Sequence, residues 1–101
     1  MRIKSAEKVG IGNGRHMITV KFFASLREEV GHGQLAFTVT SLTELRIALA
    51  DHLSGDAQKA LWADGVRLAI NQQFLASDWR ASSEEIGPSA EIAFLPPVTG
   101  G

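Results

Sequence analysis

A stripe of leucines at helical spacing is the feature of this chain that most constrains its fold. The four leucines recur at intervals of three and four residues: Leu42, Leu45, Leu49 and Leu53. This spacing places them on one face of a single amphipathic helix. Ser41 stands three residues before Glu44, the pattern of a capping box at a helix N-terminus, and Gly55 is expected to end the helix. Because such a helix cannot bury its apolar face alone, the rest of the chain must supply a surface that covers it.

Four segments rich in β-branched and aromatic residues predict the strands of that surface. They are residues 18–24, 34–40, 66–71 and 90–95. The polar residues 25–33, read as a short helical turn or loop, join the first two strands, which favours a hairpin. A shorter helical segment, residues 56–63, follows the main helix. Within the connection formed by residues 72–89, Phe74 and Trp79 are the predicted core anchors.

The order strand, strand, helix, strand, strand predicts an α+β fold with a mixed sheet of about four strands packed on one main helix. A β-grasp roll fits this order and length, and other two-layer α+β topologies fit them too. A length of 101 residues is typical of one domain. We therefore expect a folded domain over residues 17–95, followed by a short, flexible C-terminal tail over residues 96–101.

The first sixteen residues differ in charge from the rest of the chain. Residues 1–16 carry a net charge of +3 and residues 17–101 a net charge of −4. The first segment shows no sustained hydrophobic period and contains Gly10, Gly12 and Gly14, whose backbone is costly in entropy to order. We expect a flexible basic leader, either a native extension or a cloning remnant, ahead of an acidic domain.

The composition excludes several classes of function. A net charge of −1 argues against a nucleic-acid binder, which needs a basic surplus. No apolar run approaches the roughly 20 residues that cross a bilayer, so no membrane segment is expected. The chain has no cysteine, which excludes disulfides and thiolate chemistry and favours a cytoplasmic location. The three histidines lack metal-ligand spacing and no catalytic set stands out, so we expect neither a metal site nor a stand-alone enzyme.

The C-terminus is the unusual part of the sequence. Pro96 and Pro97 stop the last predicted strand because proline offers no N–H to a neighbouring strand. Four residues follow them: Val98, Thr99, Gly100 and Gly101. Glycine lacks a Cβ, so a terminal carboxylate on this narrow backbone can enter a tight tunnel and approach a nucleotide closely. A frayed terminus is the alternative, but a Gly-Gly ending after a proline-stopped strand favours a functional tail whose reactive atom is the carboxyl carbon of Gly101.

Three segments of the sequence resemble one known family. The ending FLPPVTGG, Phe94 to Gly101, is the most specific, and the segments VKFFASLRE, Val20 to Glu28, and LAINQ, Leu68 to Gln72, support it. Over residues 17–101 the chain resembles the small subunit of molybdopterin synthase, a family of ubiquitin-like sulfur carriers. Residues 86–91, which read IGPSAE, depart from the acidic turn that family members often carry before the last strand. This departure bears on partner contacts rather than on the fold.

The resemblance implies a β-grasp fold and a cycle of sulfur transfer. An E1-like adenylating enzyme would use ATP to activate the carboxylate of Gly101, and a sulfur donor would convert the acyl-adenylate into a thiocarboxylate. The tail would then enter the large subunit of molybdopterin synthase, within a heterotetramer, where the sulfur passes to the pterin precursor of the molybdenum cofactor. The chain itself would bind no cofactor and supply no catalytic side chain. The tail residues implied to contact the partner are Pro96, Pro97, Val98, Thr99 and Gly100, the last as a steric spacer.

Two apolar side chains are out of phase with the buried sets of their strands. Phe23 alternates with Phe22, and Leu95 alternates with Phe94, so both are expected on the outer face of the sheet. Outward apolar side chains near the tail would form a partner patch, unless a loop covers them.

Three other functions share parts of this pattern. The chain would also fit a sulfur carrier for another pathway, such as thiamine synthesis, although the thiamine carriers are usually shorter and lack the PPVTGG ending. It would fit a ubiquitin-like modifier that is conjugated to lysines through Gly101. A plain binding module with a frayed terminus is the third alternative, and it requires that loss of the terminal glycines changes nothing.

Overall fold

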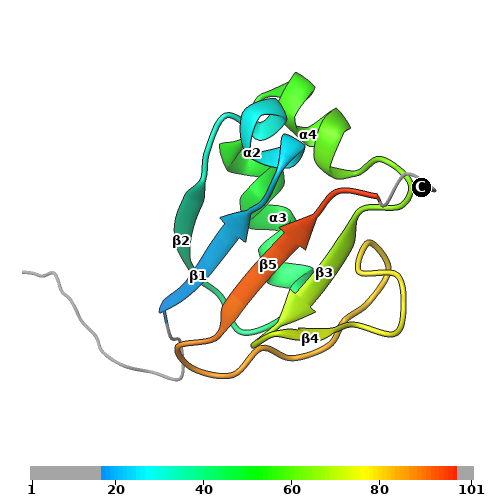
Figure 1. The fold of residues 1–101 in the computed structure, drawn as a ribbon. Helices are drawn as coiled ribbons and strands as arrows, with labels where there is room; N and C mark the ends of the chain where they lie inside the picture. The colour runs from blue at the N-terminus through cyan, green and yellow to red at the C-terminus, as the bar shows by residue number, and fades with distance from the viewer. Residues whose placement is uncertain (1–16, 98–101) are drawn as a thin grey trace, which may run out of the picture.

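The domain is a five-stranded mixed sheet with one long helix across one face (Figure 1). The computed structural model describes residues 17–97. The predicted leader, residues 1–16, and the tail residues 98–101 lie outside the described residues, and the predicted domain limits stay a prediction. In chain order the elements are β1 (Met17–Phe22), α2 (Ser25–Val30), β2 (Gln34–Thr38), α3 (Leu42–His52), α4 (Gly55–Leu61), β3 (Arg67–Ile70), β4 (Gln73–Phe74) and β5 (Glu91–Leu95).

The strands lie in the order β2, β1, β5, β3, β4. The hairpin of β1 and β2 is antiparallel, as predicted, and the last strand, β5, lies parallel to β1 in the centre of the sheet. The strand β3 runs antiparallel to both β5 and β4. The short helices α2 and α4 pack together at one end of the sheet (Figure 1). This mixed sheet on one main helix confirms the predicted β-grasp arrangement, with one strand more than expected.

The helix α3 begins where the capping pattern predicts. The Ser41 hydroxyl accepts a hydrogen bond from the backbone N–H of Glu44 at 3.2 Å. The Glu44 carboxylate reaches back one residue further than a standard capping box does, and accepts from the N–H of Thr40 at 2.9 Å. Two backbone donors at the start of the helix are therefore satisfied by side chains.

The end of α3 differs from the prediction. The helix ends at His52, and Leu53 leaves it with an extended backbone. Gly55 does not end this helix but is the first residue of α4, so that prediction is wrong. The cause is Ser54, whose hydroxyl accepts a hydrogen bond from the N–H of Ala57 at 3.1 Å and starts the new helix.

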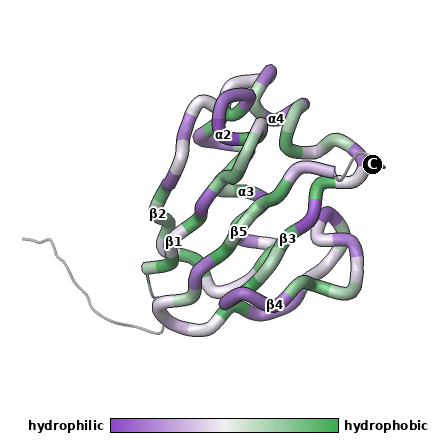
Figure 2. Tube along the Cα trace, viewed as in Figure 1, coloured by the Kyte–Doolittle hydropathy of each residue, from purple (hydrophilic) through white to green (hydrophobic). Residues whose placement is uncertain are grey.

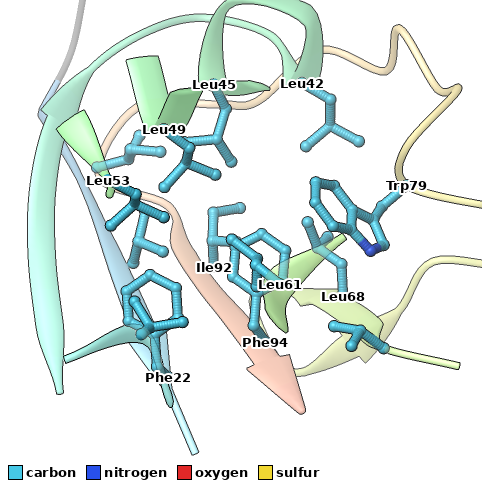
Figure 3. Close-up of a cluster of buried hydrophobic side chains, with 14 of the residues drawn as sticks. Phe22, Leu42, Leu45, Leu49, Leu53, Leu61, Leu68, Trp79, Ile92 and Phe94 are labelled. Carbon is cyan, nitrogen blue, oxygen red and sulfur yellow. The ribbon is translucent and has the colours of Figure 1, made fainter. Parts of the chain in front are cut away.

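The leucines of α3 pack against the inner face of the sheet (Figure 3). Three of them, Leu42, Leu45 and Leu49, are completely buried. The sheet meets them with alternate residues of its central strands, because side chains two apart share a face. These residues are Ile18, Val20, Phe22, Leu68, Ile92 and Phe94. Three leucines of the predicted stripe therefore form the helical half of the core, and Leu53, which lies just beyond the helix, is buried as well.

Aromatic rings close the core on the side of β3 and β5. The rings of Phe22 and Phe94 stack with centroids 5.6 Å apart. The Trp79 ring meets the Phe94 ring edge-on at 4.8 Å, and Trp79 is 2% exposed, which confirms it as a core anchor. Along the trace, β3 and β5 carry mostly hydrophobic residues whereas α2 is mainly hydrophilic (Figure 2). The sheet centre is thus apolar over most of its length.

Phe74 is not a core anchor, contrary to the prediction. It lies in β4, a two-residue strand within the segment expected to be mostly connection, and it pairs with Ala69 of β3. Ala69 follows Leu68 in β3, so its side chain lies on the opposite face of the sheet. Its partner Phe74 lies on that same face and is 49% exposed. The exposed ring lies on the outer face, where it contributes to the site described next.

Candidate functional site

The base of the tail leaves the sheet beside the turn that precedes β3. In the antiparallel pairing of β3 with β5, Arg67 lies opposite Leu95. Continued by two residues, this register brings Gly65 opposite Pro97. A Cβ atom placed on Gly65 would lie 2.7 Å from the Cβ of Pro97, closer than such atoms approach in proteins. Gly65 also has a φ of +90°, which glycine adopts without strain. The contact between them therefore requires glycine at position 65.

Arg80 braces this turn from the neighbouring loop. Its Nη1 donates to the backbone oxygen of Trp62 at 2.9 Å and to Oδ1 of Asp64 at 3.0 Å. Its Nη2 donates to Oδ2 of Asp78 at 2.8 Å. The hydrogen bonds from Arg80 lower the pKa of the Asp78 carboxyl from 3.8 to about 2. One guanidinium thus connects the loop around residue 78 with the residues immediately before Gly65.

An apolar hollow lies on the outer face of the sheet, close to where the tail begins. Its volume is about 280 Å³, and we call it the outer hollow. The residues that line it come from the end of β1, from β3 to β4 and from β5: Phe23, Ala69, Gln72, Phe74, Glu91, Ala93 and Leu95. Phe23 is 43% exposed, and its backbone N–H still donates to the oxygen of Phe94 at 3.1 Å, which fixes the start of its side chain against β5.

Two charged contacts hold residues at the rim of the outer hollow. The guanidinium carbon of Arg67 lies 3.9 Å from the centre of the Phe74 ring, a cation–π contact. The Nζ of Lys21 lies 2.9 Å from a carboxylate oxygen of Glu91. The outer hollow therefore offers an apolar floor with both charges at its edge, a combination typical of protein docking surfaces.

The structure places the predicted site residues as follows. Phe23 and Leu95 lie on the outer face as expected, and both line the outer hollow. Pro96 is half-buried and Pro97 is exposed. Four predicted tail residues lie outside the described residues: Val98, Thr99, Gly100 and Gly101.

The sequence analysis missed several residues of this region. The pair Asp64 and Gly65 carries the signal of a turn in the sequence, but the contact of Gly65 with Pro97 depends on strand register, which a single sequence does not give. Phe74 carried the signal of an aromatic residue, but was assigned to the core. Arg80 carried no signal, because an arginine in a polar loop is ordinary.

The histidines of the described residues form no metal site. The rings of His32 and His52 lie 5.6 Å apart, and His52 also contacts the ring of Phe37. Over residues 17–97 no three histidine, aspartate or glutamate side chains are placed to hold a metal ion together. Within the same residues, none of the helices has the length and apolar character to cross a bilayer.

Comparison with known proteins gives matches over most of the chain. A model of the ThiS family matches residues 20–101. The molybdopterin synthase sulfur carrier subunit of Escherichia coli (strain K12) is 38% identical to this chain, over 84% of the chain and all of that protein.

Among solved structures, the similarity is one of fold. Small archaeal modifier protein 1 from Methanosarcina acetivorans has a TM-score of 0.62 at 24% identity, and the match covers 88% of this chain and 100% of that one. A chain in the complex of subunits 1 and 2 of the molybdopterin-converting factor from Helicobacter pylori has a TM-score of 0.59 at 22% identity, over 84% and 99% of the two chains.

Proposed function

The chain belongs to the ThiS family, and from that premise we propose that it is the sulfur carrier subunit of a molybdopterin synthase. The observation that carries this proposal is the 38% identity with a molybdopterin synthase sulfur carrier subunit, which extends over the whole of that protein. The ending FLPPVTGG and the tail base that emerges beside an exposed apolar hollow support the same function.

In the proposed cycle the reactive group is the C-terminal carboxylate of Gly101. A carboxylate oxygen attacks the α-phosphorus of ATP on an adenylating partner, which releases pyrophosphate and leaves an acyl-adenylate. Sulfur at the oxidation level of sulfide, delivered by a donor, then displaces AMP and leaves a thiocarboxylate. When that sulfur passes to the pterin precursor, an oxygen from water restores the carboxylate. ATP is used by the partner, and the carrier itself holds no cofactor.

The carrier contributes transport rather than catalytic side chains. The acids and bases of each step belong to the partners, and the tail residues Val98 to Gly100 pass through the partner's tunnel as an extended backbone. We assign the outer hollow as the surface that docks on the large subunit, because Phe23 and Phe74 there expose apolar rings beside the start of the tail. The known assembly of the two Helicobacter pylori subunits supports a large-subunit partner. A heterotetramer in the cytoplasm is the arrangement we propose.

Intact mass spectrometry tests the proposal directly. The protein is incubated with a cognate adenylating enzyme, ATP and a sulfur donor, and its mass is then measured. We expect a gain equal to the replacement of one oxygen by sulfur, located at Gly101. The matched control lacks Gly100 and Gly101 and should gain nothing. An unchanged mass would overturn the proposal if the same adenylating enzyme activates another sulfur carrier in a parallel reaction.

A second step separates the pathways. The thiocarboxylated protein is mixed with the large subunit and the pterin precursor, and we expect loss of the sulfur from the carrier. Transfer only to a thiamine precursor would assign the chain to the other sulfur pathway. Covalent conjugates with lysines of other proteins in a lysate would make it a modifier.

A further inference from the structure

The contact between Pro97 and Gly65 has consequences for the proposed sulfur carrier, on whose function this inference rests. We propose that Gly65 is a positioning residue: it seats Pro97, and thereby fixes the point from which the tail reaches its partners. We give Gly65 no part in the chemistry of the carboxylate. It acts through Pro97 alone.

The contact of Pro97 with Gly65, which we call the seat, follows from the register of the sheet. Beyond the pair Arg67 and Leu95, each segment continues for two residues, and the Pro97 ring then lies next to Gly65. The distances from a Cβ on Gly65 would be 2.7 Å to the Cβ, 3.3 Å to the Cγ and 3.7 Å to the Cα of Pro97. Proline offers no N–H, so Pro97 cannot donate a hydrogen bond to the neighbouring segment and meets Gly65 by packing.

The seat is rigid on both sides. Val66, next to Gly65, is buried, and its N–H donates to the oxygen of Ala63 at 3.4 Å. The bonds from Arg80 hold the turn before it, as described above. On the other side, the two consecutive prolines each have a fixed φ, which makes a stiff link between β5 and the tail. A fixed turn against a stiff link determines the position of Pro97.

The position of Pro97 limits where the carrier group can go. Four residues separate Pro97 from the C-terminus, and a fully extended chain spans about 3.5 Å per residue, so the carboxylate of Gly101 lies at most about 14 Å beyond Pro97. If Pro97 is displaced, the region that the Gly101 carboxylate can reach is displaced with it, relative to the domain docked on its partner. Reaction rates fall steeply with misplacement, by up to about a hundredfold for 1 Å.

The substitution Gly65→Ala tests the seat, and Gly31→Ala is its matched control. Both glycines have a positive φ, +90° and +88°, so alanine causes the same kind of backbone strain at each. A Cβ on Gly31 has no neighbour within 4 Å among the described residues, whereas one on Gly65 meets Pro97. The difference between the two variants therefore isolates the contact with Pro97.

The assay is the rate of thiocarboxylation, followed by intact mass. We expect Gly65→Ala to lower kcat roughly tenfold with KM within about twofold, because the body still docks and only the delivery of the tail is impaired. Gly31→Ala should stay within about twofold of the unsubstituted protein in both constants. Urea unfolding of each variant confirms that the compared proteins are folded. Equal kcat values for the two variants would overturn the proposal.

A double variant tests whether Gly65 acts through Pro97. In Pro97→Gly the ring is gone, so adding Gly65→Ala should lower kcat no more than Gly31→Ala does, since only the backbone strain at the positive φ is left. A further tenfold loss in the double variant would show that the loss does not come from the contact with Pro97, and would overturn the proposal.

A nuclear Overhauser contact between the α-protons of Gly65 and the side-chain protons of Pro97 gives a test that does not depend on sulfur transfer. Its absence in the folded protein would overturn the seat. If the unsubstituted protein gains no sulfur, the proposed function fails, and this contact still decides the inference about the seat.

Discussion

Phe23→Ala measures how much the outer hollow contributes to docking. Phe23 is 43% exposed, and a phenylalanine side chain presents roughly 200 Å² when free. A partner that covers the ring therefore removes about 85 Å² of apolar surface from water. At about 25 cal/mol per Å² this area is worth about 2 kcal/mol. We expect the Kd for the large subunit to rise about thirtyfold.

The assay is a titration of the purified large subunit with the unsubstituted protein and with the Phe23→Ala variant, by calorimetry or by fluorescence. Ile47→Ala is the matched control: Ile47 is 66% exposed but lies on α3, which covers the inner face of the sheet. It should leave the Kd unchanged. Urea unfolding confirms that Phe23→Ala is folded at the temperature of the titration. Equal Kd values for the two variants would refute the docking assignment.

Three further predictions concern the stability of the domain. Ser41→Ala removes the cap of α3 and should lower the free energy of unfolding by about 1 kcal/mol in a urea titration, and no change would contradict the capping role. Leu49→Ala leaves a cavity at a completely buried position and should cost about 2–5 kcal/mol in the same titration, whereas less than 1 kcal/mol would contradict the packing. Asp78 should titrate at about pH 2 by NMR, below its ordinary 3.8, because Arg80 stabilises the carboxylate. Since the folded-state pKa is lowered, this stabilisation is present above about pH 4 and lost as the pH falls through 2, and a midpoint near 3.8 would contradict the contact.

Local signals predicted the parts of the fold that depend on neighbours in sequence. The leucine stripe predicted the buried face of α3, because the period of a helix is fixed. The alternation along β1 and β5 gave the inner and outer faces, and with them the outward positions of Phe23 and Leu95. The cap at Ser41 was predicted as well, because it needs only the next three residues.

The features that were mispredicted depend on contacts between distant segments or on a choice between two local signals. Phe74 was assigned to the core because an aromatic ring in a connection usually anchors it, but its pairing with Ala69 turns it to the outer face. Gly55 serves equally well after a helix or at the start of one, and the Ser54 cap decided between them. The seat of Pro97 on Gly65 depends on the register of two strands, which no local pattern encodes.

The central place of β5 has a consequence for how the chain folds during synthesis. The strand at the middle of the sheet is made last, and its partners β1 and β3 come much earlier in the chain. Until Ile92 and Phe94 have left the ribosome, the helix has only part of a sheet to cover it, and the core stays open. Pairing of such distant segments also slows the folding of the finished chain. A chain cut short before β5 would therefore lack the central strand of the sheet, and the leucines of α3 would lose the cover that Ile92 and Phe94 provide.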